Sequence, residues 1–286
     1  MRRRTPTSHA GRSHSTHRLT RRQAHSAQRV VPQPAVPVAQ HPPPHTPAGS
    51  QRSARGPPTS GAGRASLFPV TSETHTTGSA GLGDLIEGFL PEDDPLTVAR
   101  LRAQELGCPS VDAASGAALC FLAAALQARA VVEIGTGGGV SGLHLLRGMA
   151  KDGILTSIDI EPEYHRAART TFSTAGFAPG RTRLIMGRAL DVLPRLTSGG
   201  YDLVFVDAAR VEYPLYYEKG VQLLRPGGVI VFHNALADGH LGDPGRRDPE
   251  TMALREVARA VREDERLVPA LLPVGGGLLV AAAADH

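Results

Sequence analysis

Two acidic residues follow apolar segments at a spacing that could bind a nucleoside. Residues 130–142 read AVVEIGTGGGVSG, an apolar run that ends in Glu133 and continues into a glycine-dense turn. Glycine lets a backbone approach a ligand closely because no Cβ stands in the way. A second apolar run, ILTSIDI, ends near Asp159, twenty-six residues after Glu133. Backbone amides and Glu133 would bind one side of a nucleoside, and Asp159 would bind its ribose hydroxyls.

These acids can meet only if a parallel sheet brings the carboxyl ends of its strands to one edge. Short apolar runs rich in Val and Ile alternate here with helix-like segments, which is typical of strands covered on both faces. The alternation predicts a Rossmann-like, doubly wound α/β sheet with helices on both faces. The expected strands are 130–134, 154–160, 183–186, 201–206 and 228–232, and the helices between them are 140–150, 161–176, 189–197 and 213–224.

The segments on either side complete this architecture. Residues 81–128 have a helical pattern, and SGAALCFLAAALQ, residues 115–127, is apolar nearly all round, which predicts a buried helix. Near the other end, a helix over 249–264 precedes two apolar runs joined by residues 275–277, all glycine. Such a pair predicts a hairpin. We therefore expect a sheet of about seven strands, mostly parallel, with an antiparallel strand from the C-terminal hairpin.

The first 72 residues differ sharply from the rest in charge. They contain eleven Arg and no Asp or Glu, whereas the remainder has 20 Lys plus Arg against 27 acids, so the formal charges are +11 and −7. We predict a disordered Pro-, Arg- and His-rich tail over 1–80 and a folded domain over 81–286. The tail could be a nucleic-acid-binding arm, an organellar targeting segment, or an inert or mis-assigned start. Outside it, nucleic acid is not an expected partner.

Composition also limits the cellular setting. No apolar run approaches the roughly 20 residues needed to span a bilayer, so no membrane partner is expected. Cys108 and Cys120 are isolated, with neither CxxC spacing nor a dense disulfide framework. We expect both to be buried thiols in a cytoplasmic protein.

Taken in order, the motifs resemble those of class I S-adenosylmethionine-dependent methyltransferases, and more narrowly the small O-methyltransferases of the catechol and caffeoyl-CoA type. The resemblance covers about residues 82–284 and rests on VVEIGTGGGVSG, LTSIDIEPEY, RLIMGRALDVLPRL, YDLVFVDA, LLRPGGVIVFHNAL and LLPVGGGLLV. It implies methyl transfer from S-adenosylmethionine to an oxygen, such as a hydroxyl, of a small-molecule acceptor. Relatives are commonly homodimers, and the N-terminal helices would be the interface.

The resemblance also implies where the cofactor's methionine end would lie. Val111 would pack near it. Glu133 and Gly135 would lie close to its amino group. Thr136 and Ser141 would contact its carboxylate, helped by the N-terminus of the following helix.

The nucleoside end of the cofactor would be held by residues of the following strands. Asp159 would bind both ribose hydroxyls, and Ile160 would lie against the adenine. Ala189 would lie beside the adenine edge. Asp207 would lie between the methyl donor and the acceptor.

The chain departs from the family pattern where relatives bind a divalent cation. The family uses an acid after the strand equivalent to 201–206, an acid after that equivalent to 228–232, and the next Asn. Here these are Asp207, His233 and Asn234, so the second acid has become His. Magnesium prefers oxygen ligands, zinc or manganese could accept this mixed set, or the site may hold no metal.

The family's candidate general base is also changed. A Lys three residues after the first acid is Arg210 here, and a guanidinium stays protonated and cannot be a base. Arg210 could instead hold an anionic substrate group, and residues 211–217, VEYPLYY, could line an aromatic pocket. Without a metal, His233 is the candidate base, and Asp207 would orient His233 or the substrate.

Two other functions remain open from the sequence. Gly137, Gly139 and Gly142 also fit GxGxxG, with Asp159 twenty residues past Gly139, which would suit a nicotinamide-dependent oxidoreductase. The altered metal positions would suit a non-catalytic, S-adenosylmethionine-binding regulatory or scaffold protein.

Overall fold

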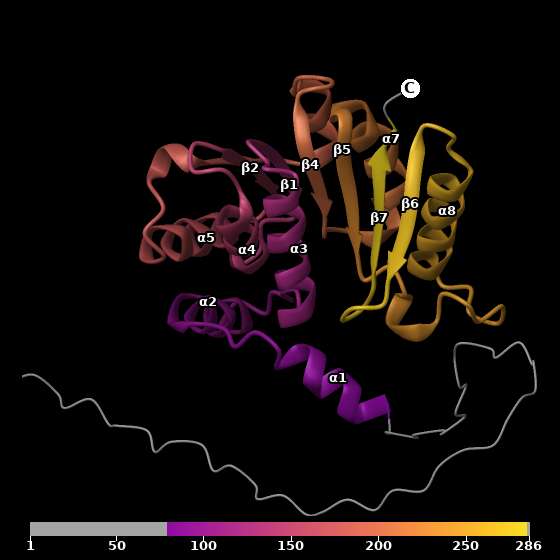
Figure 1. Cartoon of the computed structure of the whole chain (residues 1–286), viewed down its shortest axis with the longest axis horizontal. Helices are drawn as coiled ribbons and strands as arrows, with labels where there is room; N and C mark the ends of the chain where they lie inside the picture. The colour runs from indigo at the N-terminus through magenta and orange to yellow at the C-terminus, as the bar shows by residue number, and fades with distance from the viewer. Residues whose placement is uncertain (1–78, 285–286) are drawn as a thin grey trace, which may run out of the picture. The chain divides into compact units, whose positions relative to one another are not determined.

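A computed structural model of the 286-residue chain describes residues 79–284 (Figure 1). The predicted tail, residues 1–80, lies outside this range except for its last two residues, which begin helix α1 (Ser79–Glu87). Within residues 79–284, no helix has both the length and the apolar character needed to cross a membrane.

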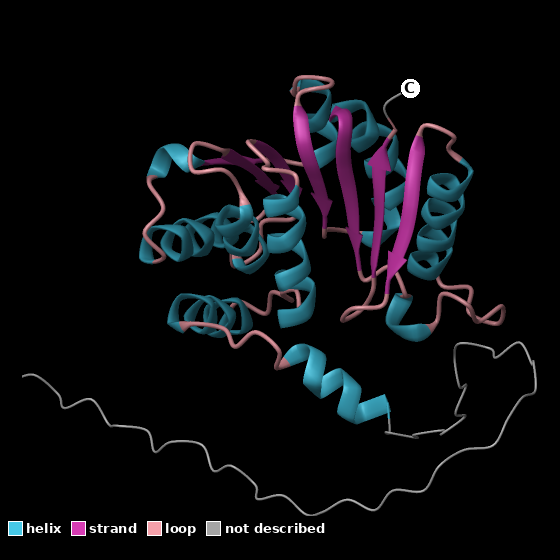
Figure 2. Cartoon of the chain, in the orientation of Figure 1, coloured by secondary structure: helices cyan, strands magenta, loops and turns pink. Residues whose placement is uncertain are grey.

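The core of the domain is one seven-stranded sheet (Figure 2). Its strand order is β3-β2-β1-β4-β5-β7-β6. The first five strands in this order run parallel, and β7 runs antiparallel to both β5 and β6. The predicted mostly parallel sheet with an antiparallel C-terminal hairpin is therefore confirmed. The strands are β1 (Ala130–Ile134), β2 (Ile154–Asp159), β3 (Thr182–Met186), β4 (Tyr201–Val206), β5 (Leu224–His233), β6 (Leu267–Leu272) and β7 (Leu278–Ala283).

Both faces of the sheet are buried, because successive side chains of each strand enter opposite cores. Val131 and Val231 belong to one apolar cluster, and their neighbours Val132 and Ile230 belong to the other. The first cluster is covered by α2 (Asp94–Glu105), α3 (Ala113–Ala125), α4 (Val140–Gly148) and α5 (Pro162–Thr174) (Figure 1). The second is covered by α6 (Ala189–Val192), α7 (Tyr213–Leu223) and α8 (Pro249–Glu263).

Aspartates fix the starts of three of these helices. Asp93, Asp112 and Asp248 each accept a hydrogen bond from a backbone N–H in the first turn, as N-cap residues do. One predicted feature of the helical layer is wrong in part. Residues 115–127 do not form a fully buried helix, because the Phe121 side chain of α3 is 70% exposed. Helix α3 therefore has a second apolar face, which points away from the core.

Helices α3 and α4 approach each other closely at glycines. A Cβ placed on Gly148 would collide with the carbonyl oxygen of Cys120. A Cβ on Gly116 would collide with the His144 ring. Glycine at both positions is therefore a packing requirement, and it lets α3 lie against the helix that follows the glycine-rich turn.

We predict that Gly148→Ala destabilises the domain. Alanine favours an isolated helix by about 1 kcal/mol over glycine. Here the added methyl meets a neighbouring backbone carbonyl, which cannot rotate away, and such overpacking costs roughly 1–3 kcal/mol. Because the gain and the cost oppose each other, urea unfolding should show a net loss of about 1 kcal/mol.

The matched control is Gly180→Ala, since nothing lies within 4 Å of a Cβ at Gly180. This variant should stay within about 0.5 kcal/mol of the wild type. Equal stabilities for both variants would contradict the close α3–α4 packing.

Candidate active site

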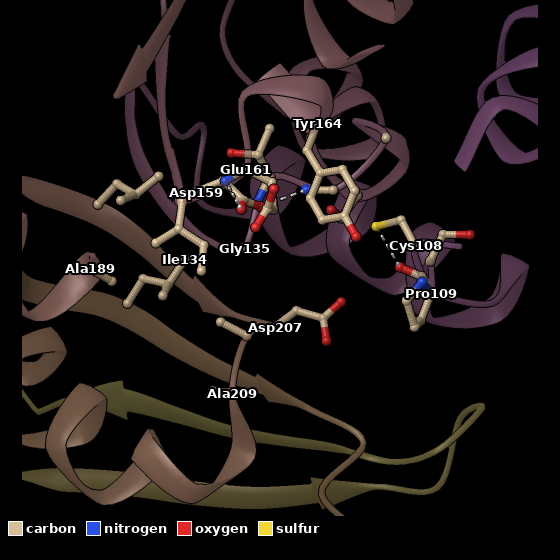
Figure 3. Close-up of a pocket in the computed structure, with 18 of the residues that line it drawn as sticks. Cys108, Pro109, Ile134, Gly135, Asp159, Glu161, Tyr164, Ala189, Asp207 and Ala209 are labelled. Atoms are coloured by element: carbon tan, nitrogen blue, oxygen red, sulfur yellow. Dashed lines mark hydrogen bonds between the residues drawn. The ribbon is translucent and has the colours of Figure 1, made fainter. Parts of the chain in front are cut away.

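A cavity with a volume of about 500 Å³ lies at the carboxyl edge of the parallel strands (Figure 3). Strand β1 has β2 on one side and β4 on the other, so the strand order reverses its direction at β1, next to the cavity. Open α/β sheets bind ligands at such a switch point. Its wall is formed by the ends of these strands, the glycine-rich turn, the segment before α3 and the start of α5.

The glycine-rich turn begins at a position that only glycine can occupy. Gly135 has φ +99°, and a Cβ there would collide with the backbone oxygen of Asp207. Its N–H donates to Ile158 O at 2.9 Å, while Asp207 N–H donates to Ile134 O at 2.8 Å. The ends of β1, β2 and β4 are thereby locked together at the floor of the pocket.

Asp159 ties the turn to the end of β2. Its Oδ2 accepts hydrogen bonds from the backbone N–H groups of Thr136 at 2.9 Å and Gly137 at 3.1 Å. Its Oδ1 accepts from the N–H of Glu161 at 3.1 Å. A carboxylate offers about four acceptor sites, so Asp159 keeps capacity for ligand hydroxyls while it holds the turn.

Glu133 is fully buried beneath the turn. Its two carboxyl oxygens accept from Ser141 Oγ at 2.6 Å and from Ser157 Oγ at 2.5 Å. Ser157 Oγ lies 2.7 Å from Thr136 Oγ1, which extends the network to the turn itself. Burial, only partly offset by the two serine hydrogen bonds, raises the pKa of Glu133 to about 8.

The structure brings most of the sequence-predicted residues to this pocket. Glu133, His233 and Asn234 lie behind its wall and do not line it. The predicted residues that line it are Val111, Gly135, Thr136, Ser141, Asp159, Ile160, Ala189, Asp207 and Arg210.

His233 lies directly behind Asp207. Its Nδ1 is hydrogen-bonded to Asp207 Oδ1 at 2.9 Å, and its Nε2 lies 3.8 Å from Asp112 Oδ2. Burial of the ring opposes its protonation, but the hydrogen bonds and charges of Asp112 and Asp207 outweigh burial and raise the pKa of His233 to about 9. The ring is therefore a cation at neutral pH, without the lone pair that a general base needs.

The Asn234 amide is directed to the loop that follows β5. Its Nδ2 donates to Asp238 Oδ1 at 3.2 Å, and its Oδ1 accepts from the Asp238 N–H at 3.4 Å. A Cβ on Gly276, in the β6–β7 turn, would lie 2.7 Å from Asn234 Oδ1. The amide oxygen therefore packs against the hairpin turn.

Arg210 lines the pocket, but its charge is already shared. Its Nη1 lies 3.2 Å from Glu250 Oε2 and 3.6 Å from Asp238 Oδ2. These partners come from the first turn of α8 and from the loop after β5. An anionic ligand would therefore compete with two carboxylates for this guanidinium.

Several residues of the wall were not predicted from the sequence, among them Tyr164, Cys108 and Arg188. Figure 3 shows the Tyr164 ring and the Asp207 carboxylate on opposite sides of the pocket. Tyr164 occurs in the quoted LTSIDIEPEY motif, so its position five residues after Asp159 was an available signal. Arg188 lies in the quoted motif RLIMGRALDVLPRL, whereas Cys108 carries no such signal and reaches the wall through tertiary packing. Glu212 and Tyr216 fall within residues 211–217, the segment predicted to line an aromatic pocket.

Sequence comparisons identify relatives of the described domain. The family model described as O-methyltransferase matches residues 96–283. A Mycobacterium tuberculosis protein, named as a probable O-methyltransferase, is 56% identical over 195 residues, which cover 68% of this chain and 87% of that protein.

Solved structures are similar over the same domain. The O-methyltransferase TomG of Streptomyces achromogenes, in complex with S-adenosylmethionine and involved in tomaymycin synthesis, has a TM-score of 0.66 and 30% identity, covering 72% of this chain and 96% of that chain. An O-methyltransferase of Bacillus cereus in complex with S-adenosylhomocysteine has a TM-score of 0.65 and 26% identity, covering 71% of this chain and 97% of that chain.

We predict that Glu133 makes stability fall with rising pH. The folded protein keeps a proton on Glu133 up to about pH 8, whereas the unfolded chain releases it above about pH 4.5. Between these values the folded state binds more protons, so the free energy of unfolding decreases by up to about 1.4 kcal/mol per pH unit from this group. Glu133→Gln should remove that component in urea unfolding between pH 5 and 8.

The control is Glu256→Gln, which changes an exposed carboxyl on α8 and should keep the wild-type pH dependence. Parallel pH profiles for wild type and Glu133→Gln would show that the buried carboxyl has an ordinary pKa.

Proposed function

The chain belongs to the O-methyltransferase family, and from this premise we propose that it methylates a hydroxyl oxygen of a small-molecule acceptor. It is an S-adenosylmethionine-dependent enzyme, as its relatives and structural neighbours are. The observation that carries the proposal is the pocket, in which the glycine-rich turn and two strand-end acids, Asp159 and Asp207, surround one cavity. The two alternative functions, a non-catalytic S-adenosylmethionine-binding scaffold protein and a nicotinamide-dependent oxidoreductase, have no comparable support.

We propose that Asp159 binds the ribose hydroxyls and that the turn holds the methionine carboxylate. Ile160 and Ala189 line the same cavity and supply an apolar surface for the adenine. At the other end, Val111 would contact the methionine chain. Glu133 acts from beneath by holding Ser141 and, through Ser157, the turn.

The chemistry needs orientation more than activation. The acceptor oxygen donates an electron pair to the methyl carbon, the C–S bond breaks with its pair returning to sulfur, and the acceptor's proton is released. Holding the reacting atoms in line supplies much of the acceleration. Asp207, whose carboxylate faces the pocket, is placed to take the proton, with His233 fixing it from behind.

The acceptor side of the pocket favours an aromatic or anionic molecule. Tyr164 and Tyr216 line the cavity and offer ring surface, and Arg210 offers a positive charge. The two free thiols, Cys108 and Cys120, support a cytoplasmic location, where thiols stay reduced.

The reaction is tested by production of S-adenosylhomocysteine. The purified chain is incubated with S-adenosylmethionine and a panel of catechols, phenolic acids and aliphatic carboxylic acids, and the product is quantified by mass spectrometry. We expect turnover with at least one phenolic acceptor and a kcat about 100-fold lower in Asp207→Asn. Turnover only with nitrogen or sulfur acceptors in a wider panel would contradict transfer to oxygen.

We also propose that the chain forms a homodimer through its N-terminal helices. Large apolar side chains are exposed on all three: Phe89 is 76% exposed beside α1, Leu101 is 55% exposed on α2, and Phe121 is 70% exposed on α3. Exposed apolar surface of this size often marks a protein–protein contact.

Phe121→Glu should therefore convert a dimer into a monomer in sedimentation velocity experiments, because a charge would be buried at the interface. Met252→Glu changes a residue that is 49% exposed on α8 and should leave the dimer intact. A wild-type monomer, or a Phe121→Glu dimer, would contradict this interface.

A further inference from the structure

Three charged groups meet behind the pocket wall, at the ends of β4 and β5. The parallel register pairs Val206 with Phe232, so the following residues, Asp207 and His233, stand side by side. The third group, Asp112, comes from the N-cap of α3. His233 thus has a carboxylate at each ring nitrogen, at 2.9 Å from Nδ1 and at 3.8 Å from Nε2.

Asp112 is held in place independently of His233. Its Oδ1 accepts from Ser115 N–H at 2.7 Å, and its Oδ2 accepts from Ser115 Oγ at 2.8 Å. The β6–β7 turn closes over it, since a Cβ on Gly275 would collide with the Asp112 carboxylate. The second carboxylate beside His233 is therefore positioned by two separate elements, α3 and the hairpin.

The residues at this position fit a divalent cation poorly. An ion shared with Asp207 would need the lone pair of His233 Nδ1, but that nitrogen is hydrogen-bonded to Asp207 Oδ1, and a carboxylate can only accept, so Nδ1 carries the proton. Hard cations also prefer oxygen to nitrogen. Of the three residues expected to bind the ion, only Asp207 has an oxygen atom at the pocket wall. Asn234 lies behind the wall, and its amide is hydrogen-bonded to Asp238.

The other described residues agree with this misfit. Residues 79–284 contain no group of three or more His, Cys, Asp or Glu side chains arranged to hold a metal ion. His233 Nε2 is buried and has no hydrogen-bond partner among the described residues. The Asp112 carboxylate lies opposite this nitrogen, with Oδ2 at 3.8 Å.

We infer that the His233 ring, held between Asp112 and Asp207 with its Nδ1–H on Asp207, takes the place of a divalent cation, so that methyl transfer by this chain needs no metal. The inference rests on the proposed methyl transfer. His233 is a positioning residue, because its hydrogen bond fixes the Asp207 carboxylate at the pocket wall. Asp112 in turn positions His233.

Without a metal, the acceptor's proton must pass to a protein group. Asp207 is the carboxylate at the wall, and its hydrogen bond to His233 leaves the second oxygen for the acceptor hydroxyl. The proton moves to Asp207 as the new C–O bond forms and sulfur recovers the electron pair of the C–S bond. Atoms and charge then balance with no further reactant.

The first test measures metal binding by the wild-type full chain. The protein is stripped with EDTA and saturated with S-adenosylhomocysteine, and Mn²⁺ is titrated while the free ion is followed by electron paramagnetic resonance. Mg²⁺ and Zn²⁺ are titrated by calorimetry. We expect no stoichiometric binding up to about 1 mM and turnover unchanged by EDTA. One equivalent of bound ion that Asp207→Asn removes would overturn the inference.

The second test restores an oxygen donor. His233→Asp should bind Mn²⁺ at least about tenfold more tightly than the wild type, because the introduced carboxylate then lies between those of Asp112 and Asp207 and supplies a third oxygen donor. His233→Asn is the matched control, equal in size but uncharged, and should show no such gain. Folding is checked by circular dichroism. If folded His233→Asp bound Mn²⁺ no more tightly than the wild type, the inference that His233 takes the place of a divalent cation would be contradicted.

Failure of this inference can be told apart from failure of the proposed function. A thermal-shift response to S-adenosylhomocysteine reports the cofactor site alone. A chain that binds neither S-adenosylhomocysteine nor S-adenosylmethionine overturns the proposed function. A chain that binds the cofactor and also a stoichiometric metal overturns only the role given to His233.

Discussion

The two hydrogen bonds from the backbone of the glycine-rich turn to Asp159 are the contact on which the pocket depends. They join the turn after β1 to the end of β2, 2.9 and 3.1 Å from Oδ2. Because the turn also opens α4, the same contact sets the direction of that helix. The pocket is thus shaped by main-chain atoms, and side chains such as Ile160 and Ala189 only line the frame they create.

Two further constraints extend this frame across the sheet. The close approach of Gly135 to the Asp207 backbone brings the end of β4 within reach of the turn. Beneath it, the buried carboxyl of Glu133 gathers the hydroxyls of Ser141 and Ser157. A carboxyl that is neutral when buried avoids the large cost of an unpaired buried charge. The turn is therefore held from below by a buried hydrogen-bond network.

Much of this could be predicted from the sequence, because period, glycine spacing and strand-end acids are local signals. The five parallel strands, the hairpin and the wall position of Asp159 follow from them, and the position of Asp207 follows from the family resemblance. Asp112 could not be found in this way, because it meets His233 only when α3, β5 and the hairpin turn pack together. Phe121 was misjudged for a related reason, since an all-apolar helix does not reveal which face the core uses.

The central claim, that this sheet edge binds a methyl-donating sulfonium nucleoside, is tested most directly by isothermal titration calorimetry with S-adenosylhomocysteine. We predict one site per chain, about tenfold or more weaker in Asp159→Asn because a charged hydrogen-bond acceptor for the ribose is lost, and no heat with NAD. Absence of heat with S-adenosylhomocysteine in the folded wild type, or an affinity unchanged in Asp159→Asn, would contradict the claim.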